Sequence, residues 1–209
     1  QEVHTASAYE QDIYTTYDLV YATMGAPMPC LPQIEPYFNL THVHPTAFDD
    51  FLKPARNILI IDIDADRYTS TKATATIDYW SHPQAVYRIQ APDDESFINY
   101  WQKHGEQVRE WFAAKELSRQ IRFYRGSTNK QARATLKRKF GLDMLIPEDY
   151  QLIMDTLDFL WCCNNKGPMR RDLVVYSYPY TDAKAFTAAS LNKKRDEVLG
   201  QYITASVEG

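Results

Sequence analysis

Apolar side chains recur with a helical period in several parts of the chain. In the first part they lie four, three and four residues apart, at Ile13, Tyr17, Val20 and Met24. This spacing puts the side chains on one face of a helix, which is predicted over 8–24. Periodicity, acidic first turns and turn residues predict further helices over 93–124, 130–140 and 182–202, with a short one from Pro45 to about Leu52.

Short runs rich in β-branched residues predict strands between these helices. The run NILIID at 57–62 is almost wholly apolar, which predicts a strand buried on both faces. Polar, threonine-rich residues at 67–80 predict a long loop or one arm of a hairpin. The other predicted strands cover 37–43, 85–90, 142–146, 150–154, 158–163 and 173–178.

The irregular order of helices and hairpins predicts an α+β fold. We expect mixed sheets with helices mainly on one face and a long central helical segment. Phe38 precedes Pro45 by seven residues, and Phe140 precedes Pro147 by seven, with similar elements after each proline. An internal β-x-β-β-α duplication accounts for this order, and so does chance similarity between common βα patterns.

Length and composition are typical of a folded protein. The chain has 209 residues, of which 44% are hydrophobic and 24% are charged. Its longest unbroken apolar run covers 159–163, far short of the ~20 residues that a membrane-spanning helix needs. We expect one α+β domain over 1–209, with two similar halves at about 1–125 and 126–209 as the alternative.

Glycine and cysteine spacing excludes several kinds of site. The seven glycines lie too far apart for the G-x-G-x-x-G, G-x-x-x-x-G-K-[ST] and G-x-S-x-G motifs. No C-x-x-C motif occurs, and Cys162 and Cys163 are neighbours in a predicted strand, so their side chains point to opposite faces. We therefore expect free thiols in the core, no cofactor, and no recognisable catalytic motif.

The net charge of −4 hides a strongly basic segment. Residues 115–139 hold nine basic residues against one acid, so they carry +8 and the remainder carries −12. Either an anionic ligand or acids elsewhere in the fold must offset this repulsion. The candidate anion-binding residues are Arg119, Arg122, Arg125, Lys130, Arg133 and Lys137. We expect at least two of these arginines to pair with acids from other elements. A pI near 5.7 argues against nucleic-acid binding.

Two short sets of side chains have the residue types of metal ligands. Asp62, Asp64 and Asp66 alternate at the end of a predicted strand, and a row of carboxylates on one face can bind Ca²⁺ or Mg²⁺. His42 and His44 share a face of another predicted strand. Rows of this kind more often end a strand in solvent, and no further histidine-rich segment exists, so no metal site is expected.

Six segments resemble, in order, a Bacteroidetes envelope family known as domain of unknown function 4837. They are LPQIEPYFNLTHVHPTAF (31–48), RNILIIDID (56–64), HPQAVYRIQAPDDESF (82–97), IPEDYQLI (146–153), DFLWCCNN (158–165) and DLVVYSYPYTD (172–182). The resemblance covers about 31–209. It implies a lipoprotein of the periplasm or outer membrane, held to the membrane only through a lipid anchor outside this chain. Family members also continue beyond the position of Gly209, so the chain resembles an incomplete domain.

These observations favour a non-catalytic binding or structural module of the cell envelope. Its partner would be an envelope protein or an anionic polymer, because the chain combines basic residues with 15 tyrosines and 4 tryptophans that stack on sugars or on proteins. The alternative is a hydrolase of envelope polymers or glycans that uses an acid pair which spacing cannot identify. A deep cleft with two facing carboxylates would favour the hydrolase, and a shallow aromatic surface would favour binding.

Overall fold

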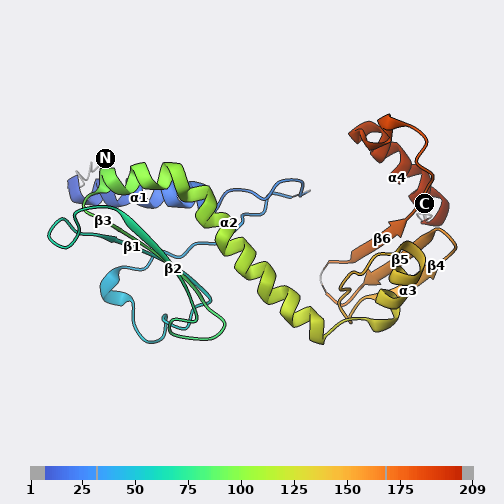
Figure 1. The fold of residues 1–209 in the computed structure, drawn as a ribbon, viewed down its shortest axis with the longest axis horizontal. Helices are drawn as coiled ribbons and strands as arrows, with labels where there is room; N and C mark the ends of the chain where they lie inside the picture. Colours follow the sequence, from blue (N-terminus) through green and yellow to red (C-terminus); the bar gives the residue numbers. More distant parts are fainter. Residues whose placement is uncertain (1–7, 32, 168, 204–209) are drawn as a thin grey trace, which may run out of the picture. The chain divides into compact units, whose positions relative to one another are not determined.

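The computed structural model describes residues 8–31, 33–167 and 169–203. Contacts divide the chain into two compact units, Gln1–Phe123 and Tyr124–Gly209. The helices and strands in chain order are α1 (Ala8–Met24), η1 (Pro45–Ala47), β1 (Asn57–Ile63), β2 (Lys72–Ile77), β3 (Ala85–Ala91), α2 (Asp94–Gly126), α3 (Lys130–Phe140), β4 (Gln151–Asp155), β5 (Phe159–Asn164), β6 (Arg171–Tyr176), η2 (Ala183–Phe186) and α4 (Ala188–Tyr202) (Figure 1). No described helix is long and apolar enough to cross a membrane.

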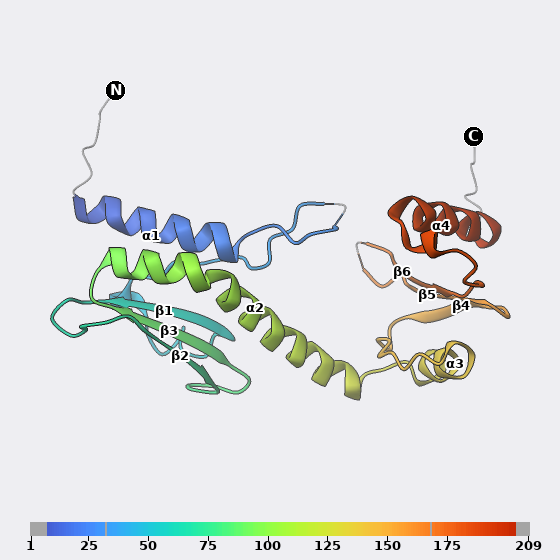
Figure 2. The same ribbon diagram turned by 45° about the horizontal axis from the view of Figure 1, so that its top comes forward.

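The first unit is a mixed three-stranded sheet with helices on one side. Its strand order is β1-β3-β2, with β1 parallel and β2 antiparallel to the central β3. Figure 2 shows α1 and the first half of α2 along the same side of this sheet. The buried residues of α2 are spaced four, four, three and four positions apart, at Phe97, Trp101, Gly105, Val108 and Phe112. This stripe packs against Ile89 of β3 and Met24 of α1, so one core joins both helices to the sheet.

Polar contacts hold α1 on α2. The indole Nε1 of Trp101 donates to Oγ1 of Thr23 at 3.0 Å. Arg109 donates to the backbone oxygen of Thr23 at 3.3 Å, and Thr16 donates to Asp94 at 3.2 Å. Because Trp101 is 1% exposed, its one polar atom needs this hydrogen bond.

The second unit is an antiparallel meander with strand order β4-β5-β6. Alternate side chains of β5 point to opposite faces. Leu160 and Cys162 pack against Leu136 of α3, whereas Phe159 stacks on Tyr202 of α4 with ring centroids 4.0 Å apart. By contrast with the first unit, α3 and α4 therefore cover opposite faces of this sheet.

The α+β fold class is confirmed, as are the predicted long helices and most strands. Two predicted strands are wrong, at 37–43 and 142–146. Apolar side chains of both segments pack in the cores, but their backbone groups do not pair with a neighbouring strand of either sheet. The carbonyl of Ile146 accepts from the backbone N–H of Asn129 at 2.8 Å and from the Thr128 hydroxyl at 2.8 Å. It therefore bonds to the two residues that precede α3 and not to a neighbouring strand.

Two smaller predictions also need correction. The helix expected from Pro45 to Leu52 is one 3-10 turn over Pro45–Ala47, followed by hydrogen-bonded turns around Asp49. β1 is half-buried along its whole length and is not buried on both faces, because it lies at an edge of the sheet. An apolar run cannot show whether its strand will be central.

The internal duplication does not fit the strand pairing. Each unit does have three strands followed by a helix, although the first strand expected in each copy, at 37–43 and at 142–146, does not form. However, the third strand is central and parallel to the first in one unit, whereas the second strand is central and all pairs are antiparallel in the other. The similar order of elements therefore does not reflect a shared topology.

Candidate binding site

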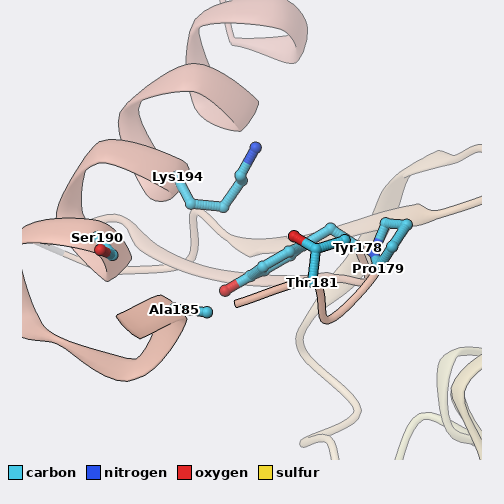
Figure 3. Close-up of a pocket in the computed structure, with 6 residues that line it drawn as sticks. All are labelled: Tyr178, Pro179, Thr181, Ala185, Ser190 and Lys194. Atoms are coloured by element: carbon cyan, nitrogen blue, oxygen red, sulfur yellow. The ribbon is translucent and has the colours of Figure 1, made fainter. Parts of the chain in front are cut away.

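A shallow pocket of about 340 Å³ lies in the second unit, where the segment after β6 passes α4. Six residues line it: Tyr178, Pro179, Thr181, Ala185, Ser190 and Lys194. Figure 3 shows the hydroxyl end of Tyr178 directed toward Ala185, and Lys194 extending from α4 on the other side of the ring. The lining thus combines an aromatic face, hydroxyl groups and one ammonium group.

Tyrosines at every second position supply the aromatic surface around this pocket. Tyr176 and Tyr178 stack with ring centroids 6.1 Å apart, and Tyr180 stacks on Phe186 at 5.4 Å. Tyr178 is 37% exposed, Tyr180 64% and Phe186 71%, so these rings present area to solvent. The period of two places Tyr176 and Tyr178 on the same side of the chain as it leaves the sheet.

Lys194 is held over this surface by two interactions. Its Nζ lies 5.4 Å from the centroid of the Tyr178 ring, a cation–π distance. The same atom donates to Glu197 at 2.6 Å, and this hydrogen bond, aided by the attraction between the charges, raises the pKa of Lys194. The ammonium group therefore stays charged and can still donate to a ligand through its remaining hydrogens.

Helix caps fix the two walls of the pocket. Asp182 begins η2 by accepting from the backbone N–H of Lys184 at 3.0 Å. Thr187 begins α4 by accepting from the backbone N–H of Ser190 at 3.3 Å. Both are the side-chain caps that polar residues form at helix starts. The signal for this site in the sequence is the run YSYPY at 176–180 ahead of a capped helix, which the motifs considered from the sequence do not include.

No carboxylate lines the pocket, so it lacks the acid pair of a glycoside hydrolase. No group of metal-ligating side chains is found within the described ranges. What the arrangement can do is stack on an apolar face and donate or accept hydrogen bonds.

The six predicted basic residues are divided between the two units. Arg119 and Arg122 lie in the first unit, and the others lie in the second: Arg125, Lys130, Arg133 and Lys137. As an anion-binding site this set stays a prediction. The contacts of its members within each unit are nevertheless clear.

Ion pairing of the arginines falls short of the expected two pairs between elements. Arg133 pairs with Asp143, beyond α3, at 2.5 Å, and this contact lowers the pKa of Asp143. Arg119 pairs with Glu116 of its own helix at 2.5 Å and donates to Asn57 of β1 at 2.5 Å. Within the described part of the chain Arg122 and Arg125 form no ion pair with an acid. The positive charges of these arginines are thus balanced less by acids from other elements than the sequence predicted.

The aspartate row closes a turn. Asp62 accepts from the Tyr68 hydroxyl at 2.6 Å, and this hydrogen bond is the main cause that raises the pKa of Tyr68. Asp64 lies beyond the end of β1 and accepts from the backbone N–H groups of Asp66 and Arg67. Asp62 and Asp64 also both lie near Nη1 of Arg67, at 3.4 and 3.9 Å, so these two carboxylates hold the β1–β2 connection around a guanidinium group.

The histidine pair is likewise separated by its contacts. The ring of His42 lies 5.3 Å from that of Tyr17, whereas Nδ1 of His44 accepts from the backbone N–H of Thr46 at 3.4 Å and caps η1. Neither residue lies in a strand, so the shared face that the sequence predicted does not form.

Ser81 and His82 do not form a nucleophile–base pair. The Ser81 hydroxyl donates to the backbone oxygen of Pro54 at 3.2 Å, whereas Nδ1 of His82 contacts Asp78 at 2.8 Å. The pKa of Asp78 is lowered, first by the hydrogen bond from the backbone N–H of Gln84 and then by His82. The cluster organises the β2–β3 connection, because the buried Gln84 side chain also donates to the backbone oxygens of Lys53 and Ala55.

The fold and the pocket together define a two-unit α+β protein with a shallow, partly aromatic pocket in its second unit. Two family models match it: a domain of unknown function (DUF8532) over residues 7–125, and a domain of unknown function (DUF4837) over 128–209. The first match covers more than half of the chain, so the protein belongs to the DUF8532 family. Neither the curated proteins nor the solved structures gave a match.

These matches shorten the range of residues over which the chain resembles DUF4837. The similarity to DUF4837 that was expected over 31–209 is confirmed for 128–209, whereas the residues before it match the other family. The change from one family to the other, between 125 and 128, falls close to the boundary between the two units at 123 and 124. The aromatic pocket lies in the DUF4837 part.

Proposed function

We propose that the protein is a non-catalytic binding module of the bacterial cell envelope, and that its aromatic pocket holds a glycan. The observation that carries this proposal is the lining of the pocket, which offers the Tyr178 ring, hydroxyl groups and the Lys194 ammonium without a carboxylate. Sugar rings have apolar C–H faces and many hydroxyls, so they match such a lining.

The location in the envelope is part of the proposal. It is supported by the resemblance of the segments at 146–182 to Bacteroidetes envelope lipoproteins, and these segments lie in the part that matches DUF4837. In this proposal a lipid anchor outside the chain tethers the module to the membrane. An acidic envelope polysaccharide suits the site best, because its charge would also attract the Lys194 ammonium group.

The proposal is tested by titrating the chain with purified Bacteroidetes envelope polysaccharide in a calorimeter. Tyr178→Ala should weaken binding about 2- to 12-fold, since one aromatic stacking contact contributes ~0.5–1.5 kcal/mol. Tyr79→Ala removes an exposed tyrosine of the first unit and serves as the matched control, for which no change is expected. Equal binding by both variants, or none by the native chain, would contradict the proposal.

The same mixture distinguishes binding from hydrolysis. A binding module should release no new reducing ends from the polysaccharide during prolonged incubation. A steady rise in reducing ends that tracks the purified protein would favour the hydrolase alternative instead.

A further inference from the structure

We propose that the edge strand β2 pairs with β2 of a second copy of this chain, antiparallel and centred on Ala75. The inference is independent of the proposed glycan site, because β2 lies in the first unit. The pairing would join two three-stranded sheets into one continuous sheet of six strands. It follows from the exposure of β2, the direction of its free backbone groups and the self-complementarity of its sequence.

β2 is an edge strand that lacks the proline, the bulge and the inward charge that protect many edges against pairing. It bonds only to β3 in the sheet, and five of its six residues are exposed. Its sequence KATATI has no proline and only one charge, at Lys72. Native edges commonly carry inward charges, prolines or bulges that prevent association. The edge strand β4 of the second unit has such an irregularity between Leu152 and Met154, whereas the register of β2 is regular throughout.

Two sets of backbone hydrogen bonds show which residues of β2 face the free edge. Ala85 donates to Arg56, and Ala91 accepts from Asp64, so the odd-numbered residues of β3 point toward β1. Asp78 donates to Gln84, so the even-numbered positions are those bonded between β2 and β3. Bonded and non-bonded pairs alternate in antiparallel strands. The N–H and C=O groups of the odd residues of β2 therefore point outward, at Ala73, Ala75 and Ile77.

Two-fold symmetry then selects one register. In an antiparallel pair, two residues that lie opposite each other have their side chains on the same face of the sheet. When the two strands are identical and related by a two-fold axis, this condition is met only if the axis passes through one residue and its own copy. Centring on Ala75 pairs it with its own copy and pairs Ala73 with Ile77, so all outward groups of the strand bond, with up to about six hydrogen bonds. It also puts Thr74 opposite Thr76, a favourable cross-strand pair.

The same register keeps like charges apart. Lys72 is the one charged residue of β2, and with Ala75 at the centre it lies outside the bonded residues 73–77, so the lysines of the two copies do not face each other. The strand contact alone buries less than a standard stable interface, so we expect a reversible dimer that forms with rising protein concentration.

Sedimentation of the full chain over a wide concentration range tests the association. Ala75→Lys would place two lysines directly opposite each other and should abolish the rise in mass seen for the native chain. Ala73→Lys makes the same change at another exposed position of the strand. There the lysine faces Ile77, so the rise in mass should be retained. A native chain that stays monomeric throughout, or two variants that behave alike, would overturn the proposal.

Cysteine cross-linking tests the register. In a chain with Cys30→Ser, the two Cα atoms of Ala75→Cys should lie ~5.5 Å apart, within the range of a disulfide. Ala73→Cys in the same background places its thiols about four residues apart along the strands, beyond ~13 Å, and is the matched control. Mild oxidation should give a covalent dimer for the first variant only. Faster dimer formation by Thr74→Cys than by Ala75→Cys would overturn the proposed register.

Discussion

Replacing Gly105 by alanine tests whether packing or helix propensity decides stability in the first unit. Gly105 lies in the middle of α2, where alanine is intrinsically favoured over glycine by ~1 kcal/mol. A Cβ added there would lie 2.8 Å from Nε1 and 2.9 Å from Cε2 of the Trp101 indole. Such distances cannot be kept, so the indole has to move.

The indole cannot move without loss. It is 1% exposed, it stacks on Phe97 with ring centroids 5.9 Å apart, and its Nε1 donates to Thr23. Overpacking of a tight core costs ~1–3 kcal/mol, and the strained hydrogen bond adds ~0.5–1.5 kcal/mol. After the gain in helix propensity, Gly105→Ala should destabilise the first unit by roughly 0.5–3.5 kcal/mol.

Gly200 offers a matched substitution with the opposite sign. It lies in α4, and a Cβ there meets no atom within 4 Å. Gly200→Ala should therefore stabilise the second unit by up to ~1 kcal/mol, with some loss because the position is near the helix end. Hydrogen exchange measured by mass spectrometry at increasing urea concentrations reports the protection of α2 and of α4 separately. A separate measurement is needed because the two units need not unfold together.

The reasoning would be refuted if Gly105→Ala slowed exchange in α2, because the propensity term would then exceed the packing cost. Equal protection of α2 in the native chain and the variant would mean that the indole can shift freely. That outcome would contradict the rigid core contacts of Trp101 described above.

Three further outcomes follow from single contacts. Gln84→Leu removes a 2% exposed amide with three hydrogen bonds to backbone groups, so it should lower the unfolding free energy of the first unit by about 1.5–4.5 kcal/mol in a urea titration. Arg119 lowers the pKa of Glu116, so the stability from this pair is present above the ordinary glutamate pKa and is lost as pH falls through the lowered value. In the Glu116→Gln variant the unfolding free energy should therefore depend less on pH in this acidic range. Burial raises the pKa of Cys162 to about 11, so a disulfide reagent should modify the exposed Cys30 at once and Cys162 only after unfolding.

Local patterns determined the secondary structure wherever the signal lies in the chain itself. The spacing of Tyr17, Val20 and Met24 gave α1, and the acids after Pro92 marked the start of α2. Alternation also fixed the faces of β5, where Cys162 and Cys163 point to opposite sides as expected. These features depend on neighbours a few residues away, which the sequence shows directly.

The tertiary structure alone decided which strands pair and where polar groups converge. An apolar run such as 57–62 has the same appearance in an edge or a central strand, because its partners come from distant parts of the chain. The segments 37–43 and 142–146 have the side-chain pattern of strands, but no partner strand lies beside them among the described residues.

The candidate site shows the same division. The tyrosines of 176–180 and the capping residues of the last helix can be identified in the sequence alone. The contact of Lys194 with the Tyr178 ring joins residues 16 positions apart and depends on how α4 folds back beside β6. Likewise, the outer edge of β2 is free because β1 pairs with β3 and not with β2. Long-range pairing is set by the packing of the whole unit, which no local pattern encodes.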